Sequence, residues 1–146
     1  MKPRIEMPTA APAAYAAMRA LSAFTGACGL EASLLELVKT RASQINGCAY
    51  CIQMHTRDAR KAGESDERLH LLAAWRETAI YTARERAALA WTESLTLLTD
   101  GHAPDAVYAE VRAQFSEEEL ANLSLAIATI NAWNRLAVGL RFVPKP

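Results

Sequence analysis

The sequence has 146 residues, and its 16 Lys and Arg residues are balanced by 16 Asp and Glu residues, so the formal net charge is zero. A chain of this length buries about two thirds of the surface that its unfolded form exposes, and we expect a single domain over residues 1–146. Without a basic block, the composition argues against binding to nucleic acid or an anionic membrane. The N-terminal stretch lacks the apolar core of a secretory signal, and no apolar run reaches the roughly 18 residues of a membrane-spanning helix, so we expect a cytoplasmic protein with no membrane partner.

The residue types favour helices throughout the chain. Ala, Leu, Glu and Arg are abundant, and no alternating run of β-branched or aromatic residues indicates a strand. The expected helix starts carry Pro or an N-cap residue, and "TARE" and "SEEE" fit the reciprocal capping box. We therefore predict an all-α, single-domain bundle of about seven helices. In chain order they run from Pro12 to near Gly26 or Gly29, from about Glu31 to Ile45, from the cysteines at 48 and 51 to Gly63, from Ser65, from Thr82 to Gly101, from Pro104, and from Ser116 to about Val138.

The last predicted helix is apolar almost all round, and its polar interruptions are Asn122, Asn131, Asn134 and Arg135. Such a helix is usually buried. It is either the central helix of one domain or a helix whose surface is partly covered by another subunit, so the sequence also hints at oligomerisation.

The segment "NGCAYCIQMH", residues 46 to 55, holds two of the three cysteines and one of the three histidines. At about 100° per residue, Cys48, Cys51 and His55 share one face of a helix. The first turn of a helix favours thiolates, through its free N–H groups and the helix dipole. His55 lies four residues beyond Cys51 and seven beyond Cys48, where its imidazole can take a thiol proton.

Three interpretations compete for this segment. A structural zinc site needs four ligands, so His70, His102 or Glu36 would have to complete it. The cysteines could be inert packing residues. A redox dithiol needs two sulfurs that can bridge without refolding, which a two-residue spacer at a helix start provides, and this interpretation is favoured.

Glu36 followed by "NGCAYCIQMH" resembles the alkyl hydroperoxidase D-like branch of the carboxymuconolactone decarboxylase family. The segments "ERAALAWTE" (residues 85–93) and "INAWNR" (residues 130–135) are similar to that branch as well, in the same order. The resemblance thus covers most of the chain. It implies the all-helical fold of that branch and homo-oligomers built from trimers, here a trimer or a hexamer.

The resemblance also implies a chemistry, the reduction of alkyl hydroperoxides by Cys48 and Cys51 with a proton relay through Glu36 and His55. Some members carry a second histidine immediately before the second cysteine, where this chain has Tyr50. No metal or organic cofactor is required, and since no nicotinamide or flavin fingerprint is present, an external dithiol must supply the electrons. Two alternatives stay open. The pair could be a redox sensor without turnover, or the chain could be a lactone decarboxylase, although the decarboxylases of the family generally lack the cysteine pair.

Individual residues carry further expectations. On a helical wheel Glu36 lies opposite the apolar face, which by itself indicates a solvated surface carboxylate, whereas the resemblance requires the third helix or another subunit to cover it. Tyr50 and Trp133 are expected to pack in the core rather than line the substrate pocket, and Cys28 to be a spectator. Because His55 is one turn from Cys51 and two from Cys48, we expect Cys51 to attack the peroxide and Cys48 to resolve it.

Overall fold

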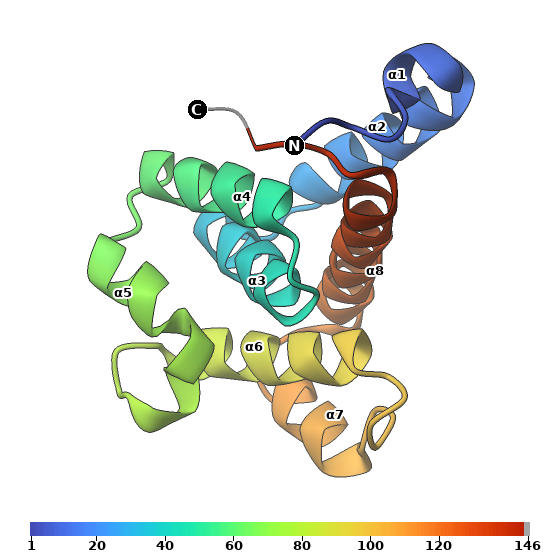
Figure 1. Cartoon of the computed structure of the whole chain (residues 1–146). Helices are drawn as coiled ribbons and strands as arrows, with labels where there is room; N and C mark the ends of the chain where they lie inside the picture. The colour runs from blue at the N-terminus through green and yellow to red at the C-terminus, as the bar shows by residue number, and fades with distance from the viewer. Residues whose placement is uncertain (145–146) are drawn as a thin grey trace.

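The computed structural model describes residues 1–144 and, over these residues, contains only helices (Figure 1). The elements are α1 (Met7–Ala10), α2 (Pro12–Gly26), α3 (Ala32–Ile45), α4 (Ala49–Lys61), α5 (Asp66–Leu71), the 3-10 helix η1 (Leu72–Glu77), α6 (Ala83–Thr96), α7 (Asp105–Arg112) and α8 (Glu117–Leu140). The all-α prediction is confirmed. The seven predicted helices correspond to α2 to α8, and the single turn of α1 was not predicted.

Local signals in the sequence set most of the boundaries. Thr82 and Ser116 form the predicted capping boxes with Glu85 and Glu119 at the starts of α6 and α8. After α4, Gly63 adopts a φ of +94°, in the left-handed region that glycine enters without a Cβ clash. These contacts satisfy backbone groups that a helix end leaves without an intrahelical partner.

One predicted boundary is wrong, and one helix whose end was not predicted changes its geometry. α6 ends at Thr96 rather than at Gly101, because its buried stripe stops there and the next residues, Leu97 and Leu98, are exposed to solvent. The helix that begins after Ser65 remains an α-helix only to Leu71. It continues as η1, where Ala74 leaves the helical region with φ −118° and ψ 28°.

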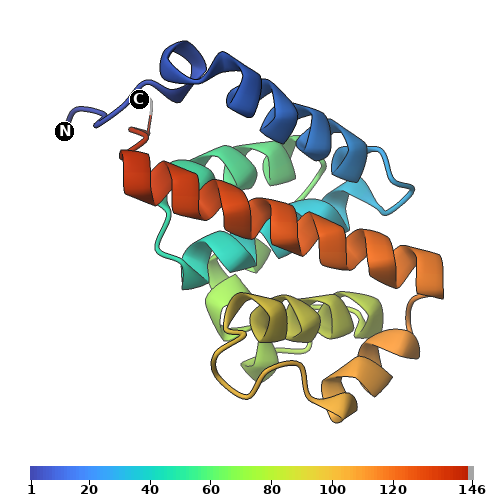
Figure 2. The same cartoon turned by 90° about the vertical axis from the view of Figure 1, so that its right-hand side faces the viewer.

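α3 lies at the centre of the bundle and packs against α4, α6 and α8. Figure 2 shows α8 crossing the molecule, with α2 on one side and α6 and α7 on the other. Leu123 and Ile127 of α8 are fully buried, so this helix is a central helix within one chain, although Val138 near its end is exposed. In the described part of the chain, no helix combines the length and hydropathy that crossing a membrane requires.

A small apolar cluster positions the cysteine pair. It brings Cys48 and Cys51 together with Ala42 of α3 and with Ile130 and Ala137 of α8. The pair therefore lies where α3, α4 and α8 meet, below the surface of the bundle.

Candidate active site

The chain enters α4 through a tight turn that orients Cys48. Gly47 takes a positive φ of 63°, and the N–H of Cys48 donates to the carbonyl of Ser43 at 3.0 Å. Cys48 is the N-cap of α4, and its Sγ accepts the N–H of Cys51 at 3.4 Å. The helix thus begins at the cysteine pair, as predicted, with Cys48 just before its first turn and Cys51 within it.

Both sulfurs are buried, and their environments differ. Cys48 and Cys51 are free thiols, each 2% exposed. Cys48 accepts one hydrogen bond from the Cys51 thiol and another from the Cys51 backbone N–H. Together they lower the pKa of Cys48 to about 7, although burial alone would raise it. The bond to Cys48, together with burial, raises the pKa of Cys51. Cys48 is therefore the sulfur that ionises first.

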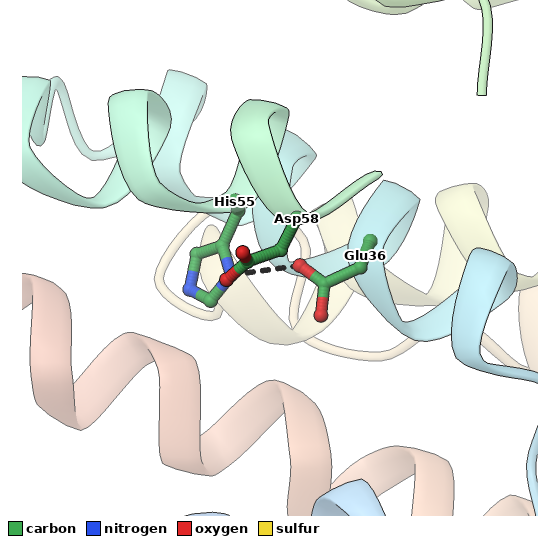
Figure 3. Close-up of side chains that lie close together, drawn as sticks. All are labelled: Glu36, His55 and Asp58. Atoms are coloured by element: carbon green, nitrogen blue, oxygen red, sulfur yellow. Dashed lines mark hydrogen bonds and ion pairs between the residues drawn. The ribbon is translucent and has the colours of Figure 1, made fainter. Parts of the chain in front are cut away.

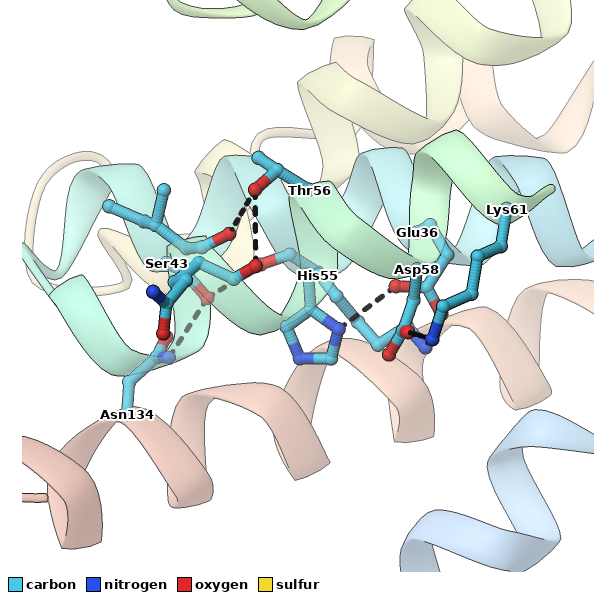
Figure 4. A network of polar contacts seen from close by, with 10 residues as sticks. Glu36, Ser43, His55, Thr56, Asp58, Lys61 and Asn134 are labelled. Atoms are coloured by element: carbon cyan, nitrogen blue, oxygen red, sulfur yellow. Dashed lines mark hydrogen bonds and ion pairs between the residues drawn. The ribbon is translucent and has the colours of Figure 1, made fainter. Parts of the chain in front are cut away.

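Asn134 of α8 is a member of the site that the sequence did not single out. Its side chain is 1% exposed and forms hydrogen bonds that lower the pKa of both thiols. Its Nδ2 also donates to Ser43 Oγ at 3.0 Å (Figure 4), and its Oδ1 accepts from Asn46 Nδ2 at 2.9 Å. The sequence signal for this residue was an Asn in an otherwise apolar helix, because a buried amide must form hydrogen bonds with neighbouring groups.

The predicted relay pair is in contact. His55 Nδ1 lies 2.9 Å from Glu36 Oε2, joining α4 to α3 (Figure 3). The Glu36 side chain is 14% exposed, so the solvated-surface interpretation from the helical wheel is wrong, and α4 covers it as the resemblance required. Burial would raise the pKa of Glu36, but the hydrogen bond with His55 and the charge of Lys39 outweigh it and lower that pKa. An ionised Glu36 accepts the Nδ1 proton of His55, which leaves Nε2 free to act as a base.

A cavity of about 420 Å³ opens beside the pair and is lined by Cys51 and His55 but not by Cys48. Tyr50 and Trp133 line it as well, contrary to the expectation that they only fill the core. Both also pack in edge-to-face contacts, Trp133 against Tyr15 and Tyr50 against Phe142. They face the cavity because α2 and the segment after α8 supply aromatic partners beside them, which spacing along the chain does not reveal.

One group of side chains has the residue types of a metal site. The ligand atoms of Glu36, His55 and Asp58 lie within 4.8 Å of one another (Figure 3). Lys39 contacts Glu36, and Lys61 Nζ donates to Asp58 at 2.9 Å. A divalent ion would have to displace both ammonium groups, so these three residues do not fit a metal centre.

The alternative zinc site, built on Cys48, Cys51 and His55, does not form among the described residues. The group with metal-ligand geometry contains His55 and Glu36, but it contains neither cysteine and neither His70 nor His102. Cys28 lies in another part of the core. Its sulfur donates to the carbonyl of Thr25 at 3.1 Å, and it packs against a different apolar cluster from the cysteine pair.

Comparison with known proteins places the chain in a family. The sequence model of the carboxymuconolactone decarboxylase family matches residues 9–94, and the chain belongs to this family. It is 39% identical to the uncharacterized protein YdfG of Bacillus subtilis (strain 168) over 140 residues, which cover 96% of this chain and 95% of the relative.

Solved structures agree with this placement. The crystal structure of ATU0492 from Agrobacterium tumefaciens, a protein of unknown function provisionally described as antioxidant defence protein AhpD, has a TM-score of 0.97 and 41% identity and covers 99% of both chains. An uncharacterized peroxidase-related protein from Ralstonia eutropha JMP134, described as an alkylhydroperoxidase AhpD core, has a TM-score of 0.78. At 21% identity, over 95% of this chain and 74% of that one, this second likeness concerns the fold alone. The chain thus has the AhpD-like fold and carries a CxxC pair.

Proposed function

We propose that the protein is a thiol peroxidase that reduces alkyl hydroperoxides through Cys48 and Cys51. One observation carries the proposal. Cys51 and His55 line the same cavity, and His55 is held by Glu36 through the ring nitrogen that faces away from the reaction. A nucleophile beside a base that a third group orients is the arrangement of activated nucleophilic catalysis.

Cys51 makes the attack in this mechanism. In the proposed step the Cys51 thiol turns its proton from Cys48 to His55 Nε2, which accepts it; the resulting thiolate attacks the terminal oxygen of the hydroperoxide, and the O–O bond breaks. The leaving alkoxide takes the proton back from the imidazolium, so the products are an alcohol and a sulfenic acid on Cys51. Glu36 stabilises the imidazolium while the proton resides on it.

Cys48 completes the oxidation. Its sulfur attacks the Cys51 sulfenic acid, a disulfide forms, and water leaves. Its low pKa suits it to this second step, because a thiolate is the reactive form in such condensations. An external dithiol then reopens the disulfide by exchange and supplies two electrons for each peroxide.

Cavity access and acidity favour different sulfurs for the first attack. The lower pKa belongs to Cys48, but Cys51 is the sulfur that lines the cavity. We give access more weight, because a peroxide that cannot reach a sulfur is not reduced by it.

Peroxide consumption measured with several dithiols tests the proposal, with Cys28→Ser as a matched control for loss of a thiol outside the site. We expect continuous turnover in the wild type and in Cys28→Ser, and none in Cys48→Ser or Cys51→Ser. Consumption that stops after one equivalent with excess dithiol would indicate a redox sensor instead. Turnover of a lactone without peroxide reduction would indicate a decarboxylase.

We also propose that the protein forms a homo-oligomer, a trimer or a hexamer. The family resemblance supports this assembly. Exposed apolar side chains on three helices support it as well: Phe24 of α2, Met54 of α4 and Val138 of α8.

A further inference from the structure

The cavity beside Cys51 has an uneven distribution of charge. Its described lining includes two cationic side chains, Arg19 of α2 and Lys39 of α3, and no carboxylate. Most of the remaining wall is apolar or aromatic, and it includes Met54, Ile130 and Trp133. A cavity with this lining offers burial to the body of a ligand and positive charge to one part of it.

Arg19 is directed toward the cavity by the helix that carries it. Tyr15, Ser22 and Ala23, at four residues before, three after and four after Arg19, also line the cavity, so Arg19 belongs to the inward face of α2. Its side chain is nevertheless exposed, as expected at the rim. Within residues 1–144 its guanidinium has neither a hydrogen bond nor an ion pair.

Lys39 differs from Arg19 because it already has an anionic partner. It contacts Glu36, whose other oxygen bonds to His55. The charges of Lys39 and Glu36 therefore largely cancel, and among the described lining residues the guanidinium of Arg19 is the charge that remains uncompensated.

From this arrangement we propose the substrate class, organic hydroperoxides that carry a carboxylate. Arg19 binds the carboxylate at the rim, the apolar walls cover the body of the molecule, and the hydroperoxide group lies at Cys51. A guanidinium can bind a carboxylate through two parallel N–H bonds, which orients the ligand as well as attracting it. The inference rests on the proposed peroxidase function and names the substrate of the same site.

The test compares two substrates of nearly equal size, the ring-carboxylated derivative of cumene hydroperoxide and its methyl ester. We expect kcat/KM to be about fivefold higher for the acid, mostly through a lower KM. The difference is small because an ion pair between solvent-exposed groups contributes little to binding. In Arg19→Gln the ratio of acid to ester should fall to about one, and Arg19→Lys, which keeps the charge but not the paired N–H bonds, should retain part of the wild-type ratio. Raising the ionic strength should reduce the wild-type ratio, since salt screens an exposed charge.

Arg57→Gln is the matched control. This variant changes the net charge by the same amount as Arg19→Gln. Arg57 is exposed on α4 and does not line the cavity, so its loss leaves the cavity unchanged. Its ratio of acid to ester should equal that of the wild type. A ratio of one in the wild type, or an equal loss in Arg19→Gln and Arg57→Gln, overturns the carboxylate proposal while peroxidase activity stands.

A binding measurement keeps the two proposals separate. The alcohols formed from the two substrates, a hydroxy acid and a hydroxy ester, are titrated by calorimetry into Cys48→Ser/Cys51→Ser protein, which performs no redox chemistry. Tighter binding of the acid that depends on Arg19 supports the carboxylate site even if neither peroxide is turned over, in which case only the proposed function fails. Equal binding of the two alcohols rejects the site.

Discussion

The contact between Glu36 and His55 predicts a specific kinetic defect in Glu36→Gln. Glutamine keeps an oxygen that can accept the Nδ1 proton of His55, but it removes the negative charge. A charge-assisted hydrogen bond is about twice as strong as a neutral one, and a neutral bond contributes about 1 kcal/mol. The variant should therefore lose about 1 to 1.5 kcal/mol of stabilisation of the imidazolium in the transition state, or roughly tenfold in rate.

His55→Ala should have a larger effect, because it removes the base itself. General-base assistance contributes about 10² to 10⁴ in rate. The two variants thus form a graded pair, in which Glu36→Gln retains a base that works less well and His55→Ala has none. Lys39 also contacts Glu36 and withdraws part of its charge, which favours the lower end of the range for Glu36→Gln.

The assay is kcat/KM for a hydroperoxide at saturating dithiol, with helical content and Tm measured for each variant. Asp58→Asn is the matched control. Asp58 lies near the ring of His55, but its side chain bonds to Lys61 rather than to the imidazole (Figure 4). This variant should retain activity within about twofold of the wild type. A wild-type rate in Glu36→Gln, or an equal loss in Asp58→Asn, would refute a relay through Glu36.

Further predictions concern the thiols and the assembly. A modest excess of hydroperoxide should form a disulfide between Cys48 and Cys51 and leave Cys28 free, and mass mapping that placed Cys28 in the main bridge would contradict this. A sulfenic-acid trap should label Cys51 in Cys48→Ser, whereas labelling of Cys48 in Cys51→Ser with no label in the other variant would exchange the two roles. Ultraviolet titration should show a thiolate that forms as the pH rises through about 7, assigned to Cys48, and in Cys51→Ala its midpoint should rise because the main donor to that sulfur is gone. Light scattering at micromolar concentration should show a trimer or a hexamer, and a monomer would count against the proposed assembly.

The parts of the fold that depend on local chemistry could be predicted from the sequence. The capping boxes at Thr82 and Ser116 and the glycine after α4 act within a few residues, so the sequence contains all that they need. For the same reason the helical wheel placed Cys51 and His55 on one face. The wheel failed for Glu36, because a helix does not determine which neighbour covers its polar side, and the resemblance supplied that information.

The rest of the site depends on contacts between distant segments. Ser43 and Asn134 are 91 positions apart and meet because α3 packs against α8. The cavity likewise needs α2 and α8 side by side before Tyr15 and Trp133 can share a wall. Such contacts follow from the packing of whole helices, and no spacing within one helix encodes them.

The position of Cys48 as the N-cap of α4 connects the stability of a helix to a redox equilibrium. In the reduced protein its sulfur accepts the N–H of Cys51, as a capping side chain does. A disulfide sulfur carries no charge and accepts poorly, so we expect oxidation to weaken this cap. Caps made by side-chain oxygen contribute about 0.5 to 2 kcal/mol in helices, and sulfur is a weaker acceptor, so the lower end of that range applies. For a two-electron couple about 1.4 kcal/mol corresponds to 30 mV, so we expect the cap to raise the reduction potential by about 10 mV. The first turn of α4 thereby favours the dithiol, which is the form of the pair that can reduce the next peroxide.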